Sequence, residues 1–97
     1  PEGMEFNATK KITDEIADQY NVKANDGVLI ADVEQGSSAD YKGLRKGMII
    51  LEVNGQVIHD VGEFNLALKK TEETGKAYLF VKVGQSVYYV TLRLDEK

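Results

Sequence analysis

The sequence predicts a single α+β domain, and three observations support this prediction. The chain has 97 residues, which is the size of one ordinary domain. It is 42% hydrophobic and 29% charged with one proline, a composition that is typical of a folded chain and not of a disordered or collagen-like one. Glycines and polar clusters separate short segments of strand or helix periodicity. We therefore expect the order strand–helix–strand–short helix–strand–strand–helix–strand–strand.

The first elements are predicted over residues 3–33. Residues 3–8 alternate apolar and polar side chains, which predicts a short strand. Thr13 is a candidate N-cap for a helix whose apolar stripe is Ile16 and Tyr20, four residues apart. Residues 28–33 are β-branched and apolar on both faces, which predicts a buried strand.

The buried strand at 28–33 contains a local conflict. Val28 and Ile30 share one face, whereas Val33 falls on the other face in strict alternation. If all three side chains belong to the core, a bulge or a strong local twist must lie between them.

The middle of the chain predicts a short helix, a second buried strand and a tight turn. Residues 36–43 hold a helix of one to two turns, after which Leu44 returns to the core. Residues 48–53 form the second buried strand. Asn-Gly at 54–55 is the strongest short-range hairpin signal, and residues 57–58 form the return strand.

The last third of the chain predicts a helix and a terminal hairpin. Asp60 and Glu63 have the spacing of a capping box, so we expect a helix from residue 61 to about Lys70. Residues 77–83 and 87–94 alternate around a Gly-Gln-Ser turn, which predicts two antiparallel strands.

The charge and hydropathy of the chain argue against several classes of partner. Twelve Lys and Arg residues against 16 Asp and Glu residues give a net charge of −4. This disfavours nonspecific binding to nucleic acid or to an anionic membrane, because both need a basic field. No apolar run approaches the roughly 20 residues of a membrane-spanning helix, and no signal-peptide pattern is present. The absence of cysteine removes disulfides and thiolate chemistry.

The inventory of reactive side chains argues against an enzyme. His59 is the only histidine, and no serine occupies a Gly-x-Ser-x-Gly motif. We expect His59 to be a solvated turn residue. Asp32 and Glu34 could form a glycosidase pair on one strand face, but a solvated edge is the favoured interpretation in so small a domain. One histidine without cysteine cannot build a structural zinc site, so we expect no catalytic residue, no metal and no cofactor.

Three tyrosines in the terminal hairpin, Tyr78, Tyr88 and Tyr89, could in principle stack nucleic-acid bases. The acidic charge and the lack of interleaved Lys and Arg favour a plain amphipathic sheet face instead. We expect no nucleic-acid partner.

Four segments together resemble a PDZ domain. They are residues 27–33, Gly36-Ser37-Ser38-Ala39, Gly43-Leu44-x-x-Gly47 and Ile50-Leu51-Glu52-Val53-Asn54-Gly55. The resemblance implies a partly open antiparallel β-sandwich or barrel of five to six strands, capped by two main helices and one short helix. The element order resembles the bacterial, circularly permuted type. Residues 1–97 are then one PDZ domain, and the start at Pro1 suggests a fragment of a longer protein.

Three further segments, at residues 3–4, 12–17 and 90–94, are similar to the C-terminal PDZ domain of Do-type (HtrA family) serine proteases. This narrower resemblance implies a non-catalytic module that recruits C-terminal or extended peptides of misfolded proteins to a protease domain of the parent chain, or regulates that domain. It also implies a periplasmic or cell-envelope location. Two alternatives stay open: an assembly module between protease subunits, and a PDZ domain of another envelope protease.

The resemblance also implies a peptide-binding site. The backbone amides of Gly3 and Met4 would hold a terminal carboxylate, and the edge that follows would pair with the peptide backbone opposite a helix. Met4, Phe6 and Leu68 would line the pocket for the last side chain. Val61 would face the third residue from the peptide end, and Asn65, one turn later, would contact the same face of the peptide. An ordinary core role for Met4, Phe6, Val61 and Leu68 is the alternative. The predicted site comprises Gly3, Met4, Glu5, Phe6, Asn7, Ala8, Val61, Asn65 and Leu68.

Overall fold

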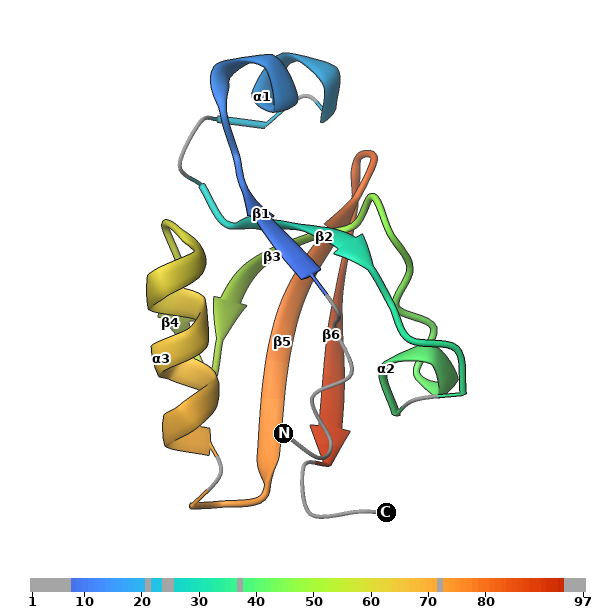
Figure 1. Cartoon of the computed structure of the whole chain (residues 1–97), viewed down its shortest axis with the longest axis vertical. Coiled ribbons are helices and arrows are strands. Elements are labelled where there is room, and N and C mark those ends of the chain that lie inside the picture. The colour runs from blue at the N-terminus through green and yellow to red at the C-terminus, as the bar shows by residue number, and fades with distance from the viewer. Residues whose placement is uncertain (1–7, 21, 24–25, 37, 72, 94–97) are drawn as a thin grey trace.

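The computed structural model describes residues 8–20, 22–23, 26–36, 38–71 and 73–93 and contains three helices and six strands in the predicted order (Figure 1). The α+β fold class is therefore confirmed. The elements are β1 (Ala8–Lys11), α1 (Asp14–Tyr20), β2 (Val28–Asp32), α2 (Ser38–Tyr41), β3 (Ile49–Val53), β4 (Gln56–Val57), α3 (Val61–Thr71), β5 (Lys76–Val83) and β6 (Ser86–Arg93).

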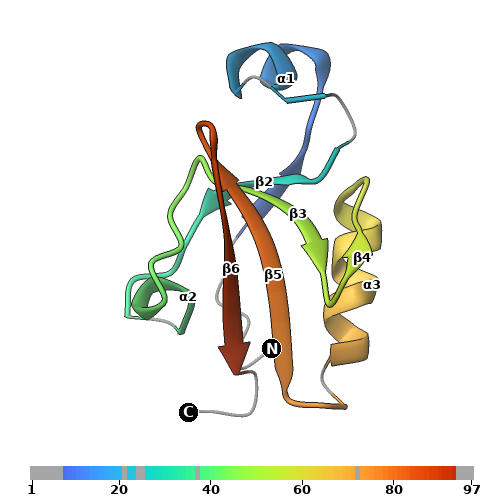
Figure 2. The ribbon, with the colours of Figure 1, turned by 180° about the vertical axis from the view of Figure 1, so that it is seen from behind.

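All strands belong to one antiparallel sheet. Its order is β1-β2-β3-β5-β6, with β4 paired to β3 beside this path. In the described part of the chain β1 and β6 are the two edges and do not pair with each other, which leaves the predicted sandwich or barrel open. Helices α3 and α2 flank the β5–β6 hairpin on opposite sides, and α1 lies beyond the hairpin turn (Figures 1 and 2).

The core consists of two clusters on the two faces of the sheet. The larger cluster packs the inner face against α2 and α3, and the smaller one packs α1 and Ile12, which precedes it, against β2 and β3. The larger cluster contains Val28, Ile30, Ala39, Leu44, Ile50, Val53, Ile58, Phe64, Ala67, Leu68, Ala77, Leu79, Val81 and Leu92. The smaller cluster contains Ile12, Ala17, Leu29 and Ile49, with Ile16, Tyr20, Val22 and Leu51 packed against it.

A bulge resolves the conflict in the strand at 28–33. Ala8 pairs with Asp32 while Thr9 pairs with Ile30, so one residue of β2 has no partner opposite it. The extra residue shifts the alternation of the chain that follows. Val33, just beyond β2, therefore packs against the same cluster as Val28 and Ile30, as the sequence argument requires.

Several predicted boundaries are confirmed by their local geometry. The Oγ1 of Thr13 accepts a hydrogen bond from the Ile16 N–H at 3.3 Å, so Thr13 caps α1. Asn54 and Gly55 both have positive φ, 52° and 80°, as a two-residue hairpin turn of the Asn-Gly type requires. The β5–β6 pairing closes at Val83 and Ser86, one residue earlier than predicted.

Two strands differ from the prediction. The strand expected at residues 3–8 falls mostly outside the described residues, and β1 begins at Ala8 and continues to Lys11. Two consecutive lysines break the apolar alternation, but backbone pairing with β2 needs no apolar side chain and sets the extent of β1. The return strand is Gln56–Val57, and Ile58, one residue beyond it, is fully buried and donates its backbone N–H to the Leu51 carbonyl oxygen at 3.0 Å.

Among the described residues, no helix has the length and apolar character needed to cross a membrane. The longest, α3, has 11 residues.

Candidate functional site

The free edge of β1 is the first component of the candidate site. β1 lies at one end of the sheet order and pairs with β2, and no other described strand pairs with its outer edge. A sheet edge presents a row of backbone N–H and C=O groups that can pair with a further extended chain. The geometry therefore permits strand addition at β1.

Helix α3 is the second component, because it contacts β1 as well as β3 and β5. Its start is a reciprocal hydrogen-bond arrangement. Asp60 Oδ1 accepts a bond from the Glu63 N–H at 2.8 Å, and Glu63 Oε1 accepts one from the His59 N–H at 2.8 Å. The capping-box prediction is confirmed, with the returning bond one residue earlier than in the usual motif.

His59 takes part in this capping arrangement. Its Nδ1 lies 2.8 Å from Glu63 Oε1, and its side chain is 55% exposed. The expected exposed turn position is confirmed, with a side-chain partner that the sequence pattern did not indicate.

The cap at Asp60 gives a testable stability prediction. Asp60→Ala is expected to lower the free energy of unfolding by about 1 kcal/mol, because it removes the acceptor for the Glu63 N–H at the start of α3. Asp60→Asn keeps an oxygen acceptor and is expected to lose less than half as much. Urea denaturation measures both variants, and equal losses in the two would contradict a capping role for this oxygen.

The predicted site residues divide into two groups. Gly3, Met4, Glu5, Phe6 and Asn7 lie outside the described residues, and Ala8 is the first residue of β1. Their assignment to a carboxylate loop and peptide edge therefore stays a prediction.

The other three predicted residues lie on α3. Val61 is half-buried and packs against the larger cluster, and Asn65 is exposed one turn later. Leu68 is only 7% exposed and belongs to that cluster. The structure thus brings all three to the helix that contacts β1. Val61 and Asn65 retain accessible surface, whereas Leu68 takes the core position that the sequence analysis kept as its alternative.

The sequence analysis missed the part of the edge formed by residues 9–11. The structure assigns these residues to β1. The one available signal was Thr9, a β-branched residue next to the predicted strand.

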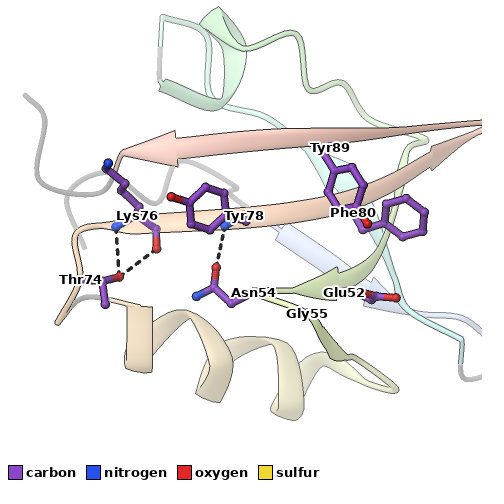
Figure 3. A pocket seen from close by; sticks show the side chains of 8 residues that line it. All are labelled: Glu52, Asn54, Gly55, Thr74, Lys76, Tyr78, Phe80 and Tyr89. Carbon is purple, nitrogen blue, oxygen red and sulfur yellow. Dashed lines mark hydrogen bonds between the residues drawn. The ribbon is translucent and has the colours of Figure 1, made fainter.

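A hollow lies away from the β1 edge, on the outer face of β3 and β5. We call it the outer pocket; it has a volume of about 580 Å³ (Figure 3). Its lining residues are Glu52, Asn54, Gly55, Thr74, Lys76, Tyr78, Phe80 and Tyr89. The sequence analysis recognised Tyr78 and Tyr89 but not Phe80 and Glu52.

Tyr88 does not share the face of the other two hairpin tyrosines. Tyr89 pairs with Phe80 and Tyr88 pairs with Val81 across β5 and β6. Cross-strand partners lie on the same face of a sheet and successive residues on opposite faces. The interpretation of the three tyrosines as one face is therefore wrong for Tyr88, because Tyr88 and Tyr89 are successive residues of β6 and point to opposite faces of the sheet.

The acid–base chemistry of the described part of the chain is sparse. No three His, Cys, Asp or Glu side chains among the described residues group together as metal ligands would. Asp40 and Arg45 form an ion pair of 2.9 Å beside α2, and its exposed arginine limits its contribution to a few tenths of a kcal/mol.

The chain is similar to known proteins in both sequence and fold. The family model described as "PDZ domain" matches residues 9–82. A "Probable periplasmic serine endoprotease DegP-like" of Chlamydia trachomatis is 35% identical over 88 residues, which are 90% of this chain and 18% of the relative. A protein of the same description from Brucella suis is 32% identical over 57 residues, which are 59% of this chain and 11% of that relative. The chain thus spans less than a fifth of these relatives.

Solved structures show the same fold. The HtrA3 PDZ domain bound to a phage-derived ligand (FGRWV) has a TM-score of 0.71 at 23% identity, covering 89% of this chain and 78% of that one. The HtrA-type protease AlgW with a decapeptide has a TM-score of 0.68 at 21% identity, covering 95% of this chain and 28% of that one. Because the family model matches well over half of the residues and the fold agrees, the chain belongs to the PDZ domain family.

Proposed function

We propose that this domain captures the C-terminus of an extended polypeptide by adding it as a strand to the free edge of β1 alongside α3. The observation that carries the proposal is that β1 contacts α3 while no other described strand pairs with the outer edge of β1. Two structural neighbours with the same fold are described with a peptide ligand. In the proposed complex Gly3 and Met4 hold the carboxylate, Val61 faces the third peptide residue from the end, and Asn65 contacts the same face of the peptide.

We further propose that residues 1–97 are one non-catalytic PDZ domain of a longer protein, a serine endoprotease of the periplasm or cell envelope. The curated relatives are named as periplasmic serine endoproteases, and this chain spans a small part of each. In that setting the domain recruits C-terminal or extended peptides of misfolded proteins to the protease domain or regulates it. Circular permutation of the domain remains part of this proposal.

A titration with one pair of peptides tests carboxylate capture. The ligands are acetyl-Gly-Gly-Val-Ala-Leu with a free carboxyl terminus and the same peptide as its carboxamide. The free acid is expected to bind with a Kd on the order of micromolar to tens of micromolar, because a short strand buries little area. The carboxamide is expected to bind at least about tenfold more weakly, because it lacks the charged acceptor.

The location of binding is read from the amide signals of the isotope-labelled domain. Free acid is expected to shift the signals of residues 3–11 and of Val61–Leu68. Shifts confined to another face, or equal affinity for acid and carboxamide, would contradict the proposal. Binding of neither peptide would contradict it as well and would favour the assembly role.

A variant of α3 sharpens this test. Val61→Asp is expected to weaken binding of the free-acid peptide about tenfold or more, because it places a carboxylate beside an apolar, anionic ligand. An acidic residue is favourable in the first turn of a helix, but Val61 also packs partly against the larger core cluster, so urea denaturation of the variant verifies that the domain remains folded. Val87→Asp on β6 is the matched control, because Val87 is 50% exposed and lies on the terminal hairpin. Equal weakening in both variants would rule out a specific role of Val61.

A further inference from the structure

We propose that the outer pocket binds the guanidinium group of an arginine side chain in a partner polypeptide. This site is separate from the β1 edge and does not depend on the function proposed above. Its principal groups are a carboxylate and two aromatic rings that come from three adjacent strands: Glu52 on β3, Phe80 on β5 and Tyr89 on β6 (Figure 3).

The strand register brings these three side chains to one row. Glu52 pairs with Phe80 across β3 and β5, and Phe80 pairs with Tyr89 across β5 and β6. The two ring centroids are 4.8 Å apart with an interplanar angle of 36°. Tyr78 extends the aromatic surface on the same face, two residues along β5.

A bulge directs the carboxylate into this row. Ile50 pairs with Val81 and Glu52 pairs with Phe80, so the register shifts at Leu51. Without the shift, Glu52 would alternate onto the same face as Ile50, which is fully buried in the core. The bulge instead places Glu52 on the outer face, which is the kind of reorientation for which bulges recur beside functional sites.

The Glu52 side chain is half-buried, and none of the hydrogen bonds or ion pairs between described residues involves it. A carboxylate beside aromatic rings has lost part of its hydration, so it gains from a cation that donates hydrogen bonds to it. The faces of the neighbouring rings carry partial negative charge and also attract a cation. The site therefore favours a positively charged ligand.

The shape of the site favours guanidinium over ammonium. A planar guanidinium stacks on an aromatic ring and simultaneously donates two parallel hydrogen bonds to a carboxylate. The lysine that lines the pocket does not occupy this position, because Lys76 lies at the opposite end, roughly 13 Å from Phe80 along β5. Lys82 lies on the same face beyond Phe80 but does not line the pocket.

The surroundings of the pocket indicate a polypeptide and not a free small cation. Tyr89 is 77% exposed and Tyr78 is 50% exposed, so both rings offer surface beyond the volume that one guanidinium fills. No helix lies over the β5–β6 hairpin in the view from behind (Figure 2). Exposed tyrosines around a charged site are typical of protein interfaces, where Tyr and Arg are the enriched residues.

The test uses two blocked peptides of identical shape. The probes are acetyl-Tyr-Gly-Arg-Gly-carboxamide and the same peptide with citrulline, whose neutral urea replaces the guanidinium. Neither has a free carboxylate, so binding is independent of carboxylate capture at the β1 edge. The arginine peptide is expected to shift the amide signals of residues 52, 78, 80 and 89 and to bind at least about tenfold more tightly than the citrulline peptide. Guanidinium chloride is the third probe and is expected to bind more weakly than the arginine peptide.

Variants of the pocket provide the second arm. Glu52→Gln is expected to weaken binding of the arginine peptide about tenfold, and Tyr89→Leu is expected to weaken it about threefold to fivefold. Glu34→Gln is the matched control, because it removes the same charge from an exposed residue outside the pocket and should leave affinity unchanged. Dispersed amide spectra verify that each variant is folded.

Three outcomes would overturn the inference. The first is equal binding of the arginine and citrulline peptides, or no binding of either. The second is wild-type affinity in both Glu52→Gln and Tyr89→Leu. The third is binding of guanidinium chloride as tight as that of the peptide, which would exclude a polypeptide as the preferred ligand.

Discussion

Gly27→Ala is expected to lower the free energy of unfolding by about 3 kcal/mol or more, which is a large fraction of the total for a domain of this size. Gly27 has φ of 93°, a conformation that costs an L-residue roughly 1–2 kcal/mol. A Cβ at this position would also collide with the backbone oxygen of Ile50, at a distance that real Cβ atoms do not adopt. Because this oxygen belongs to β3, relief of the collision requires the β2–β3 pairing to open.

Gly36→Ala separates the two causes. Gly36 has a similar φ of 83°, but a Cβ built there meets no atom within 4 Å. This control is expected to lose only the conformational part, roughly 1 kcal/mol. Thermal unfolding monitored by circular dichroism measures both, with a fall in melting temperature of roughly 15 °C for Gly27→Ala and about 5 °C for Gly36→Ala. Equal losses would show that the contact with Ile50 is not a determinant of stability.

Phe64→Ala is the second substitution with a large expected effect, a loss of about 3–5 kcal/mol. Phe64 is 2% exposed and is the largest fully buried side chain of the larger core cluster. Its removal leaves a cavity between α3 and the sheet that the neighbouring strands can fill only partly. Urea denaturation at fixed temperature measures the loss.

Leu66→Ala is the control on the same helix. Leu66 is 57% exposed, so its truncation is expected to change stability by less than about 0.5 kcal/mol. Because α3 also contacts β1, Phe64→Ala should lower the affinity of the domain for the free-acid peptide as well as its stability. Leu66→Ala should leave the affinity for this peptide unchanged. A loss of unfolding free energy below about 1 kcal/mol for Phe64→Ala would contradict the conclusion that α3 packs tightly against the core through this side chain.

Local signals accounted for most of the elements. The capping residues Thr13 and Asp60 and the Asn-Gly turn at 54–55 act through hydrogen bonds or φ values within a few residues. Such short-range interactions are readable from sequence because both partners are neighbours in the chain. The irregular alternation of the apolar residues Val28, Ile30 and Val33 predicted a bulge or a strong twist, and the structure has a bulge there.

The register of the sheet was not readable in this way. The extent of β1 depends on its pairing with β2, which lies beyond α1 in the chain. The placement of Tyr89 on the same face as Tyr78 depends on the pairing of β5 and β6, whereas the separation of Tyr88 from Tyr89 follows from strand alternation alone. A shift of one residue moves every side chain of a strand to the other face, so composition alone does not assign a face.

The candidate site was likewise only partly predictable from the sequence. Sequence and resemblance predicted a peptide-binding role for Val61 and Asn65, which stays a prediction, and the structure places their helix α3 in contact with β1. Leu68 satisfies both pocket and core periodicity, and its 7% exposure places it in the core. The outer pocket was not predicted, because its carboxylate reaches the outer face through the bulge at Leu51.

By itself the sequence determined the fold class and the order of the elements, since both depend on local propensity and on the periodicity of apolar residues. Tertiary structure alone decided which strand edge is free, which helix contacts it, and which side chains share a face. These features arise from hydrogen-bonded pairing between segments that are distant in the chain. In such pairing a single extra residue, such as Leu51 at the bulge, changes which side chains of the strand lie on the outer face of the sheet.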